Sequence, residues 1–469
     1  MNEQITPLAY LAAAVLFVFA LKKMASPKTA RLGNLLGAVG MLIAIGFTLA
    51  ARSGGVPAVR GVGWAFVVIG ALVGAGAGAF LAITVKMTAM PQMVAVFNGL
   101  GGLASGLVVF AEVWRYPGAF FDTDPGRYLA VAVGLSTLIG WVTFTGSLVA
   151  FAKLQEFVLS GRPMTFPMQR IANFALLGLT VLLIVVWGVA PGQRWLILPV
   201  AALAAALGVL FTIPIGGADM PVIISLLNSY SGLAACATGF VLGNPGLIIA
   251  GSLVGASGIV LTRIMCVAMN RSLANVLFAA VGSAVAGPAD GTERRVTSWT
   301  PEDAAMTLDN ASLVVIVPGY GMAVAQAQHA VKELADLLSE RGVTVKFGIH
   351  PVAGRMPGHM NVLLAEAEVP YEQLCDMDEI NPELERADAA LVLGANDVVN
   401  PAARHDESSP IYGMPILNVD KARTVMVCKR SLNPGFAGID NELFYADNTA
   451  MLFGDGKATI TAIVAAMKE

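Results

Sequence analysis

Residues Ser312–Gln326 read SLVVIVPGYGMAVAQ, and this stretch decides the fold of the last third of the chain. Its first six residues are apolar and mostly β-branched, which is typical of a buried strand. A turn of Gly319, Tyr320 and Gly321 follows, and the pattern after it predicts a helix that runs to about Glu340. A strand, a glycine turn and a helix offer free N–H groups to the pyrophosphate of a dinucleotide. Such turns are common, so the surrounding residues must decide what this one binds.

The rest of this region alternates apolar strand patterns with helical ones, which indicates a doubly wound parallel sheet. The sequence predicts strands at 312–317, 343–349, 389–393, 415–418, 424–428 and 443–446. It predicts helices at 321–340, 358–366, 398–403 and 456–467. Residues 311–469 are therefore predicted to form one soluble α/β Rossmann-like domain. Residues 271–310 are polar and rich in Gly and Pro towards their end, which predicts a linker with a short capped helix after Thr300.

The part of the chain before the linker has a different composition. The whole chain is 56% hydrophobic, 13% charged and holds 50 glycines, which is not the composition of a soluble protein. Residues 1–289 carry 15 Lys/Arg and 6 Asp/Glu, whereas residues 290–469 carry 14 and 26. Residues 1–289 therefore carry a net charge of +9, and residues 290–469 carry −12. This difference predicts that the first part lies in a bilayer and the second part in water.

The first part, residues 1–270, is predicted to be a membrane bundle of about nine helices. A bilayer core needs about 20 mostly apolar residues per helix. The qualifying windows are 5–21, 32–50, 61–85, 91–113, 127–150, 171–190, 194–214, 221–243 and 246–268, and 271–287 is a weaker tenth. Glycine-rich runs at 74–78, 99–102 and 251–258 predict close contacts between helices.

The positions of the basic residues predict the orientation. If the N-terminus is outside, the inner loops carry ten Lys/Arg and the outer loops five, which agrees with the excess of positive charge on the inner side. Nine spans then place the C-terminal domain in the cytoplasm or matrix. The four cysteines have no zinc or disulfide spacing, so no metal site is predicted and a reducing compartment is permitted.

Polar residues inside the spans are candidates for a proton route, because such groups are costly in a bilayer. Asn98 lies in the middle of the fourth span, Asn228 lies in the eighth, and Asp219 lies at the inner mouth of the eighth. The alternative for each asparagine is a hydrogen bond between helices. None of the four histidines lies in a span, so this chain alone is not expected to build a histidine relay.

Three loops of the soluble domain follow predicted strands and carry polar groups. Residues 350–359 hold Arg355 among small residues, and residues 393–397 end a strand where ligands bind in open α/β sheets. Lys429, Arg430 and Ser431 follow a later strand and form a good receptor for a monophosphate, the ribose 2′-phosphate that distinguishes NADP from NAD. A solvated basic turn is the alternative, although the domain is otherwise acidic.

Several motifs together resemble the β subunit of proton-translocating nicotinamide nucleotide transhydrogenases. They are PGYGMAVAQAQ (318–328), GIHPVAGRMPGHMN (348–361), GAND (394–397), KRS (429–431), GFAG (435–438), IGGADMP (215–221) and LNSYS (227–231). The resemblance implies that the soluble domain binds NADP(H) and faces an NAD(H)-binding domain on an α subunit of one or two chains. It further implies direct hydride transfer coupled to proton movement, a homodimer of αβ units in a lipid membrane, the bacterial inner membrane as location, and no nucleic-acid partner.

The resemblance also implies roles for individual residues. The cofactor-binding residues would be Gly319, Tyr320, Gly321, Met322, Ala323, Val324, Val352, Ala353, Gly354, Arg355, Gly394, Ala395, Asn396, Asp397, Lys429, Arg430, Ser431, Gly435, Phe436, Ala437 and Gly438. Asp397 would also sense protonation near the cofactor, and 435–438 would cover it. Some family members have a histidine where Asn98 stands, so we expect the titrating group of the route to come from a partner helix.

A different class of protein fits part of the pattern. An ion channel or transporter gated by a nucleotide-sensing Rossmann domain would keep the nine spans and the glycine turn. It would not need the receptor formed by Lys429, Arg430 and Ser431. Direct hydride transfer, by contrast, needs no protein acid or base, and the sequence has no nucleophile–His–carboxylate pattern.

Overall fold

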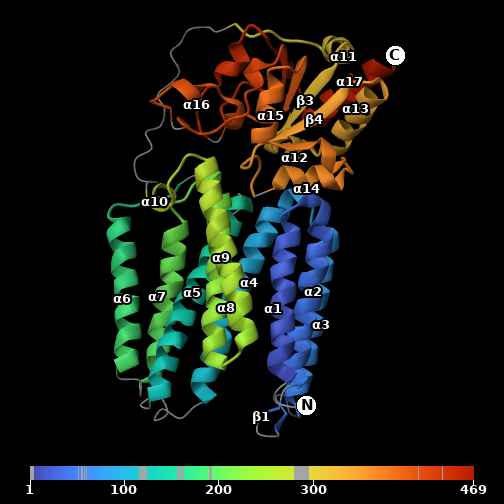
Figure 1. Ribbon diagram of the computed structural model, residues 1–469. Coiled ribbons are helices and arrows are strands. Elements are labelled where there is room, and N and C mark those ends of the chain that lie inside the picture. Colours follow the sequence, from blue (N-terminus) through green and yellow to red (C-terminus); the bar gives the residue numbers. More distant parts are fainter. Residues whose placement is uncertain are drawn as a thin grey trace. The chain divides into compact units, whose positions relative to one another are not determined.

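The chain divides into two compact units in the computed structural model (Figure 1). The first comprises residues 1–214 and 223–261, and the second comprises 215–222 and 262–469. The structure describes residues 5–50, 52–53, 56–57, 59, 61–115, 124–155, 159, 163–189, 193–278, 295–356, 358–409, 411–435 and 437–469. The middle of the predicted linker, 279–294, and the predicted site residue Phe436 lie outside these ranges.

Nine helices of the described residues are long and apolar enough to cross a membrane, as predicted. They are α1 (Ile5–Met24), α2 (Pro27–Ala50), α3 (Gly63–Thr84), α4 (Met90–Arg115), α5 (Asp124–Gln155), α6 (Gln169–Val189), α7 (Ile197–Thr212), α8 (Met220–Leu242) and α9 (Pro245–Ala268). The weak tenth window contains only the short α10 (Leu273–Phe278). Two-residue strands, β1 (Arg52–Ser53) and β2 (Val56–Pro57), pair between α2 and α3.

Glycines decide how closely the membrane helices pack. A Cβ added to Gly102 of α4 would lie 2.6 Å from the carbonyl oxygen of Gly140 in α5, and one added to Gly251 of α9 would lie 2.4 Å from the nitrogen of Cys236 in α8. These helices therefore touch through their backbones. The prediction for 74–78 was wrong within the described chain, because a Cβ on Gly74, Gly76 or Gly78 meets nothing within 4 Å and α3 has no buried residue.

The second unit contains a six-stranded parallel sheet in the order β5-β4-β3-β6-β7-β8. The strands are β3 (Leu313–Pro318), β4 (Thr344–Ile349), β5 (Leu374–Asp376), β6 (Ala389–Leu393), β7 (Thr424–Lys429) and β8 (Thr449–Phe453). The chain moves outward from β3 to β4 and β5, and then returns to pair β6 with the other side of β3. This reversal creates a crevice at the carboxyl ends of β3 and β6, where ligands bind in doubly wound sheets.

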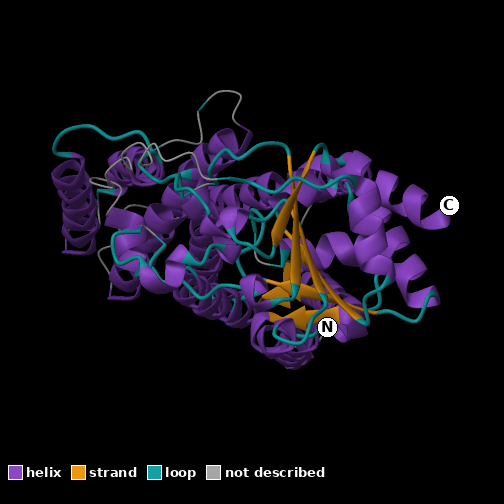
Figure 2. Cartoon of the chain, turned by 90° about the horizontal axis from the view of Figure 1, so that it is seen from above, coloured by secondary structure: helices purple, strands orange, loops and turns teal. Residues whose placement is uncertain are grey.

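Helices cover the sheet because its central strands are apolar on both faces. They are α11 (Pro301–Asp309), α12 (Tyr320–Ala325), α13 (Gln328–Glu340), α14 (His359–Glu366), α15 (Met377–Leu384), α16 (Ala402–His405) and α17 (Gly456–Lys468). On one face, Val315, Val392 and Val427 pack with Ile380 of α15 and with Phe444 in a single core. Figure 2 shows the twisted strands nearly edge-on.

Several predictions of elements were wrong. Residues 415–418 do not form a strand, because the Leu417 N–H donates to Val398 O and Ile416 O accepts from the Asn381 side chain. Residues 442–445 form a 3-10 turn that the Asn441 side chain caps, and the edge strand is β8 instead. Both β5 and α15 were missed.

The predicted helix 321–340 is two helices. Gln326 adopts a left-handed conformation, with φ of 50°, and ends α12 after six residues. Helix α13 then begins at Gln328. The predicted helix 398–403 is likewise a 3-10 turn at 397–399 followed by α16. The predicted capped helix after Thr300 is confirmed, since Thr300 and Asp303 form a reciprocal capping box at the start of α11.

Candidate functional site

The glycine turn after β3 meets the turn after β6, backbone against backbone. The Gly319 N–H donates to Leu393 O at 2.9 Å, and the Gly321 N–H donates to Gly394 O at 3.0 Å. A Cβ on Gly319 would lie 2.4 Å from Ala395 Cα. These glycines are therefore required by the close contact of two βα turns at the crevice.

The same crevice opens into a cavity of about 280 Å³. Its walls come from the carboxyl ends of β6 and β7 and from the segments that follow β3, β6, β7 and β8. The lining residues are Gly321, Val324, Ala325, Leu393, Gly394, Cys428, Lys429, Arg430, Ser431, Asn433, Pro434, Gly454 and Gly456. The structure thus brings the glycine turn and the predicted phosphate receptor, more than 100 residues apart in sequence, to one cavity.

The two cations of the receptor have different surroundings. The Lys429 ammonium donates to Asn433 O and lies 4.9 Å from the centre of the Phe444 ring. Burial lowers the pKa of Lys429, and the carboxylates of Asp397 and Asp440 oppose that shift. Arg430 is more exposed and donates to Asp455 at 2.8 Å. Asp455 also caps α17 by accepting from the Lys457 and Ala458 N–H groups.

Asp397 anchors the predicted covering loop. Its carboxylate accepts the Ala437 N–H at 3.0 Å, and a Cβ on Gly435 would lie 2.6 Å from the same carboxylate. Gly438 has a left-handed backbone, with φ of 72°, and its N–H closes a turn onto Gly435 O. Loop 435–438 is therefore attached to the end of β6 through Asp397.

The loop after β4 brings Arg355 to the other side of the glycine turn. The Arg355 guanidinium stacks on the Tyr320 ring, 4.4 Å from its centre. The backbone N–H of Arg355 donates to His359 Nδ1 at 3.1 Å, and Gly354 has a φ of 108° that suits this tight return. Val352 and Ala353 belong to the same loop, whereas Met322 and Ala323 are buried in α12. The cavity lining includes none of the predicted site residues Arg355, Val352, Ala353, Met322 and Ala323.

Both histidines of the 350–359 loop are neutral structural groups. His350 Nε2–H donates to Pro415 O at 2.8 Å, and its Nδ1 accepts the Val352 N–H. Burial lowers the pKa of His350 to about 4, and burial together with the charge of Arg355 lowers that of His359 to about 4. Neither ring is charged at neutral pH.

The pKa of His350 predicts a pH-dependent stability. An unfolded chain takes up a proton as pH falls below the ordinary value of 6.5, whereas the folded site resists until about 4. The folded state should therefore lose about 2 kcal/mol from this group between pH 7 and pH 5. We expect His350→Asn, which cannot titrate, to show a smaller difference in Tm between pH 7.5 and pH 5 by circular dichroism. An unchanged difference would contradict the neutral assignment.

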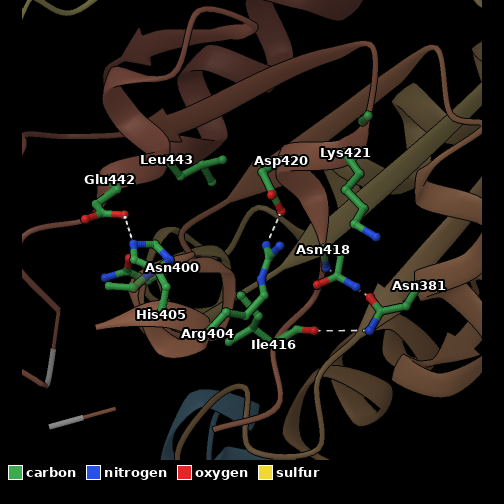
Figure 3. Close-up of polar contacts among 12 residues, drawn as sticks. Asn381, Asn400, Arg404, His405, Ile416, Asn418, Asp420, Lys421, Glu442 and Leu443 are labelled. Atoms are coloured by element: carbon green, nitrogen blue, oxygen red, sulfur yellow. Dashed lines mark hydrogen bonds and ion pairs between the residues drawn. The ribbon is translucent and has the colours of Figure 1, made fainter. Parts of the chain in front are cut away.

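Buried asparagines that the sequence analysis did not single out support the cavity. Asn441 Nδ2 donates to Asn396 O at 3.0 Å, and Asn400 Nδ2 donates to Asp440 O at 2.9 Å. Figure 3 shows the surrounding contacts, in which His405 meets Glu442 and Arg404 meets Asp420. The bonds of Asn441, Asn400 and His405 join the segments after β6 and β7, whereas the pair of Arg404 and Asp420 lies within the segment between these strands. Their only signal in the sequence is the frequency of Asn between predicted elements.

The two membrane asparagines lie on neighbouring helices. Asn98 of α4 is buried, and its Nδ2 donates to Ile224 O of α8 at 3.2 Å. Ile224 is one turn before Asn228 on the same face of α8. A Cβ on Gly101 would also lie 2.5 Å from Ser231 Oγ, so α4 and α8 touch along this face. Asn98 therefore makes a hydrogen bond between helices, which was the alternative to a place in a proton route.

Asp219 forms an ion pair that the sequence analysis missed. Arg271 Nη1 lies 2.9 and 3.1 Å from its two carboxylate oxygens, and the Asp219 side chain is only 14% exposed. Because the two residues are 52 positions apart, their pairing carries no local sequence signal.

Comparison with known proteins gives the family. A family model described as "NAD(P) transhydrogenase beta subunit" matches residues 6–466. Two proteins from Rhodospirillum rubrum, one of them from a named strain, carry the name NAD(P) transhydrogenase subunit beta. Each is 51% identical to this chain over 474 aligned residues, with both chains covered completely. The match spans the membrane helices as well as the sheet, and the chain therefore belongs to the NAD(P) transhydrogenase β-subunit family.

Proposed function

We propose that this chain binds NADP(H) and, with an NAD(H)-binding α subunit, carries out hydride transfer between NADH and NADP⁺ coupled to proton movement across a membrane. Membership of the family implies the use of nicotinamide nucleotides and an α-subunit partner. The observation that carries the choice of NADP(H) is the cavity that joins the glycine turn to Lys429, Arg430 and Ser431.

The residues of the cavity suit this cofactor chemically. Two cations and a hydroxyl at its rim match a phosphate monoester, and the glycine turn lets a pyrophosphate approach the backbone closely. Arg355, stacked on Tyr320, would add a cation on the far side of the turn. When bound, the nicotinamide ring supplies the hydride chemistry, which needs no acid or base from the protein.

The protein's own part is to bind, orient and exclude water. Loop 435–438, tied to Asp397, would cover the cofactor, and Asp397 would report protonation near it. Coupling requires that cofactor state, loop order and protonation in the membrane be linked free energies. A membrane potential of about 100 mV is worth about 2.3 kcal/mol per proton, which would favour NADPH formation by tens-fold.

We assign residues 1–270 to proton translocation, 271–310 to the linker and 311–469 to NADP(H) binding. Asn98, Asn228 and Asp219 are proposed to line the proton route, with the titrating group supplied by a helix of the α subunit. The excess of basic residues supports an N-terminus outside and a cytoplasmic C-terminal domain in a bacterial inner membrane. We further propose a homodimer of αβ units.

A reconstituted reaction tests the function. The purified αβ complex in sealed vesicles should reduce an NAD analogue with NADPH while a pH-sensitive dye reports proton movement. A chain that conducts ions on nucleotide addition without any hydride transfer would overturn the proposal in favour of a gated channel. The β chain freed of partner helices should not move protons, because the titrating group would be absent.

Asp219→Asn should reduce coupled proton movement more than it reduces NADP(H) affinity. The substitution removes the charge that pairs with Arg271, and because the Arg271 side chain is 36% exposed, solvent screens the charge that is left behind and the loss of stability should be modest. Proton movement in vesicles and the Kd for NADPH are the two measurements. Asp336→Asn is the matched control, since Asp336 is an exposed partner of Lys332 within one helix. A larger loss of affinity than of coupling would contradict the assignment.

A further inference from the structure

Lys153 is the only fully buried charged side chain among the described membrane helices, with 1% of its surface exposed. It lies two residues before the end of α5, where a lysine ordinarily extends its ammonium to the membrane surface. Its Nζ instead donates to the carbonyl oxygen of Ile213, the residue that follows α7. Because Cβ bonds tilt towards the N-terminus of a helix, the side chain reaches back along α5 into the bundle.

The hydroxyl next to this contact has no partner. Thr212 precedes Ile213, is completely buried, and its Oγ1 makes no hydrogen bond to any described residue. A Cβ on Gly146 of α5 would lie 2.9 Å from this oxygen. Gly146 and Lys153 are seven residues apart, hence on one face of α5. The Lys153 ammonium and the Thr212 hydroxyl therefore share the contact between α5 and α7.

Two further buried polar atoms without partners among the described residues lie where α4 packs on α5. Ser147 Oγ, next to Gly146, has none among the described residues, and Gly99 of α4 packs on the Ser147 Cβ. Gln92, near the start of α4, donates from Nε2 to Leu154 O at 3.3 Å, while its Oε1 accepts from no described group. Gln92 therefore lies at the same end of the bundle as Lys153.

Buried polar atoms without protein partners are ordinarily satisfied by ordered water. Thr212 precedes the residue that Lys153 bonds, Gln92 bonds the residue after Lys153, and Ser147 lies six residues earlier on α5, so water is expected between α4, α5 and α7 at this end. Burial disfavours a charge, and lysine, unlike arginine, gives up its proton under that pressure. A lysine in contact with such water can therefore exist both as the protonated ammonium and as the neutral amine.

We propose that Lys153, in series with the titrating group supplied by the α subunit, takes up and releases the transported proton at the inner end of the route, through water bound by Thr212, Ser147 and Gln92. This inference rests on the proton coupling proposed above. In one step a hydronium ion gives its proton to the neutral Nζ amine and becomes water. In the next, the ammonium gives a proton to a second water on the opposite side. The amine keeps an N–H for Ile213 O in both states.

Lys153→Arg in the complete αβ complex tests the proposal. Arginine keeps the charge and the donors but does not release a proton. In sealed vesicles we expect the dye-detected pumping rate and net NADPH formation to fall by about 100-fold. Hydride exchange between NADH and an NAD analogue through bound NADP(H), which consumes no net proton, should stay within about twofold of wild type. Thr212→Val should lower pumping by roughly fivefold through loss of bound water.

Two controls separate this role from a structural one. Thr180→Val removes a fully buried hydroxyl that bonds to Leu176 O of its own helix, and Lys86→Arg changes an exposed lysine. Both should pump at the wild-type rate. Wild-type pumping by Lys153→Arg overturns the inference, as does an equal loss of pumping and exchange in an assembled complex. If Lys153→Arg does not assemble, wild-type pumping by Thr212→Val overturns it. A wild-type complex that exchanges hydride without pumping overturns the proposed function instead.

Discussion

Replacing Lys429 and Arg430 together by alanine should weaken NADPH binding by about 100-fold while leaving membrane assembly intact, because each charge-assisted hydrogen bond to a phosphate contributes about 1.5–3 kcal/mol. We take the lower end of that range, since the Arg430 side chain is 65% exposed and solvent screens it. Titration calorimetry with NADPH measures the loss. NADH, which lacks the 2′-phosphate, should bind the variant and the wild type equally weakly.

Strand β7 supplies a matched control for this prediction. Lys421 and Arg423 precede the strand, as Lys429 and Arg430 follow it, and both are exposed at the opposite edge of the sheet. Their joint replacement by alanine removes the same net charge and should leave NADPH affinity unchanged. Equal losses in the two double variants would mean that the overall field of the domain, rather than a local receptor, attracts the phosphate.

Gly394→Ala is expected to abolish NADP(H) binding and to destabilise the sheet domain by about 3 kcal/mol or more. Gly394 has a left-handed backbone, with φ of 68°, and an added Cβ would lie 2.3 Å from Gly321 Cα. Because the obstacle is backbone, the turns after β3 and β6 would have to separate. NADPH titration and thermal unfolding of the purified chain measure the two effects.

Gly342→Ala isolates the contribution of backbone strain. Gly342 also has a left-handed conformation, with φ of 85°, but a Cβ there meets nothing within 4 Å. It should cost about 1 kcal/mol of stability and no affinity for NADPH. If both variants behaved alike, the close contact of the two turns would not be what the crevice requires.

The membrane spans and the central strands could be predicted because their signals are local. Nine apolar windows correspond to nine helices, and β3, β4, β6 and β7 were found within one or two residues. Apolar length reports a span, and a run of β-branched residues reports a buried strand. The family, too, could be recognised from motifs confined to a few residues each.

The errors fall where distant contacts override local pattern. Residues 415–418 look like a strand, but the Asn381 side chain takes their backbone groups. Strand β5 has only three residues, too few for a period to show. The pairing of Asp219 with Arg271, the burial of Lys153 and the asparagine bonds around Asn396 all join segments far apart in the chain. A single sequence does not show which of its distant segments come into contact in the folded chain.

The bond between Arg430 and Asp455 gives the phosphate receptor a resident counter-ion. A guanidinium that is paired with Asp455 should bind chloride or inorganic phosphate from solution more weakly than an unpaired one would. A ligand phosphate must compete with that carboxylate for the Arg430 guanidinium. Its second negative charge and its contacts with Lys429 and Ser431 would give it the advantage. Asp455 accepts from Arg430 at Oδ2 and caps α17 at Oδ1, so the proposed phosphate site and the first turn of the C-terminal helix depend on one side chain. If the site binds NADP(H) as proposed, its selectivity would depend on the Asp455 carboxylate as well as on the cations of Lys429 and Arg430.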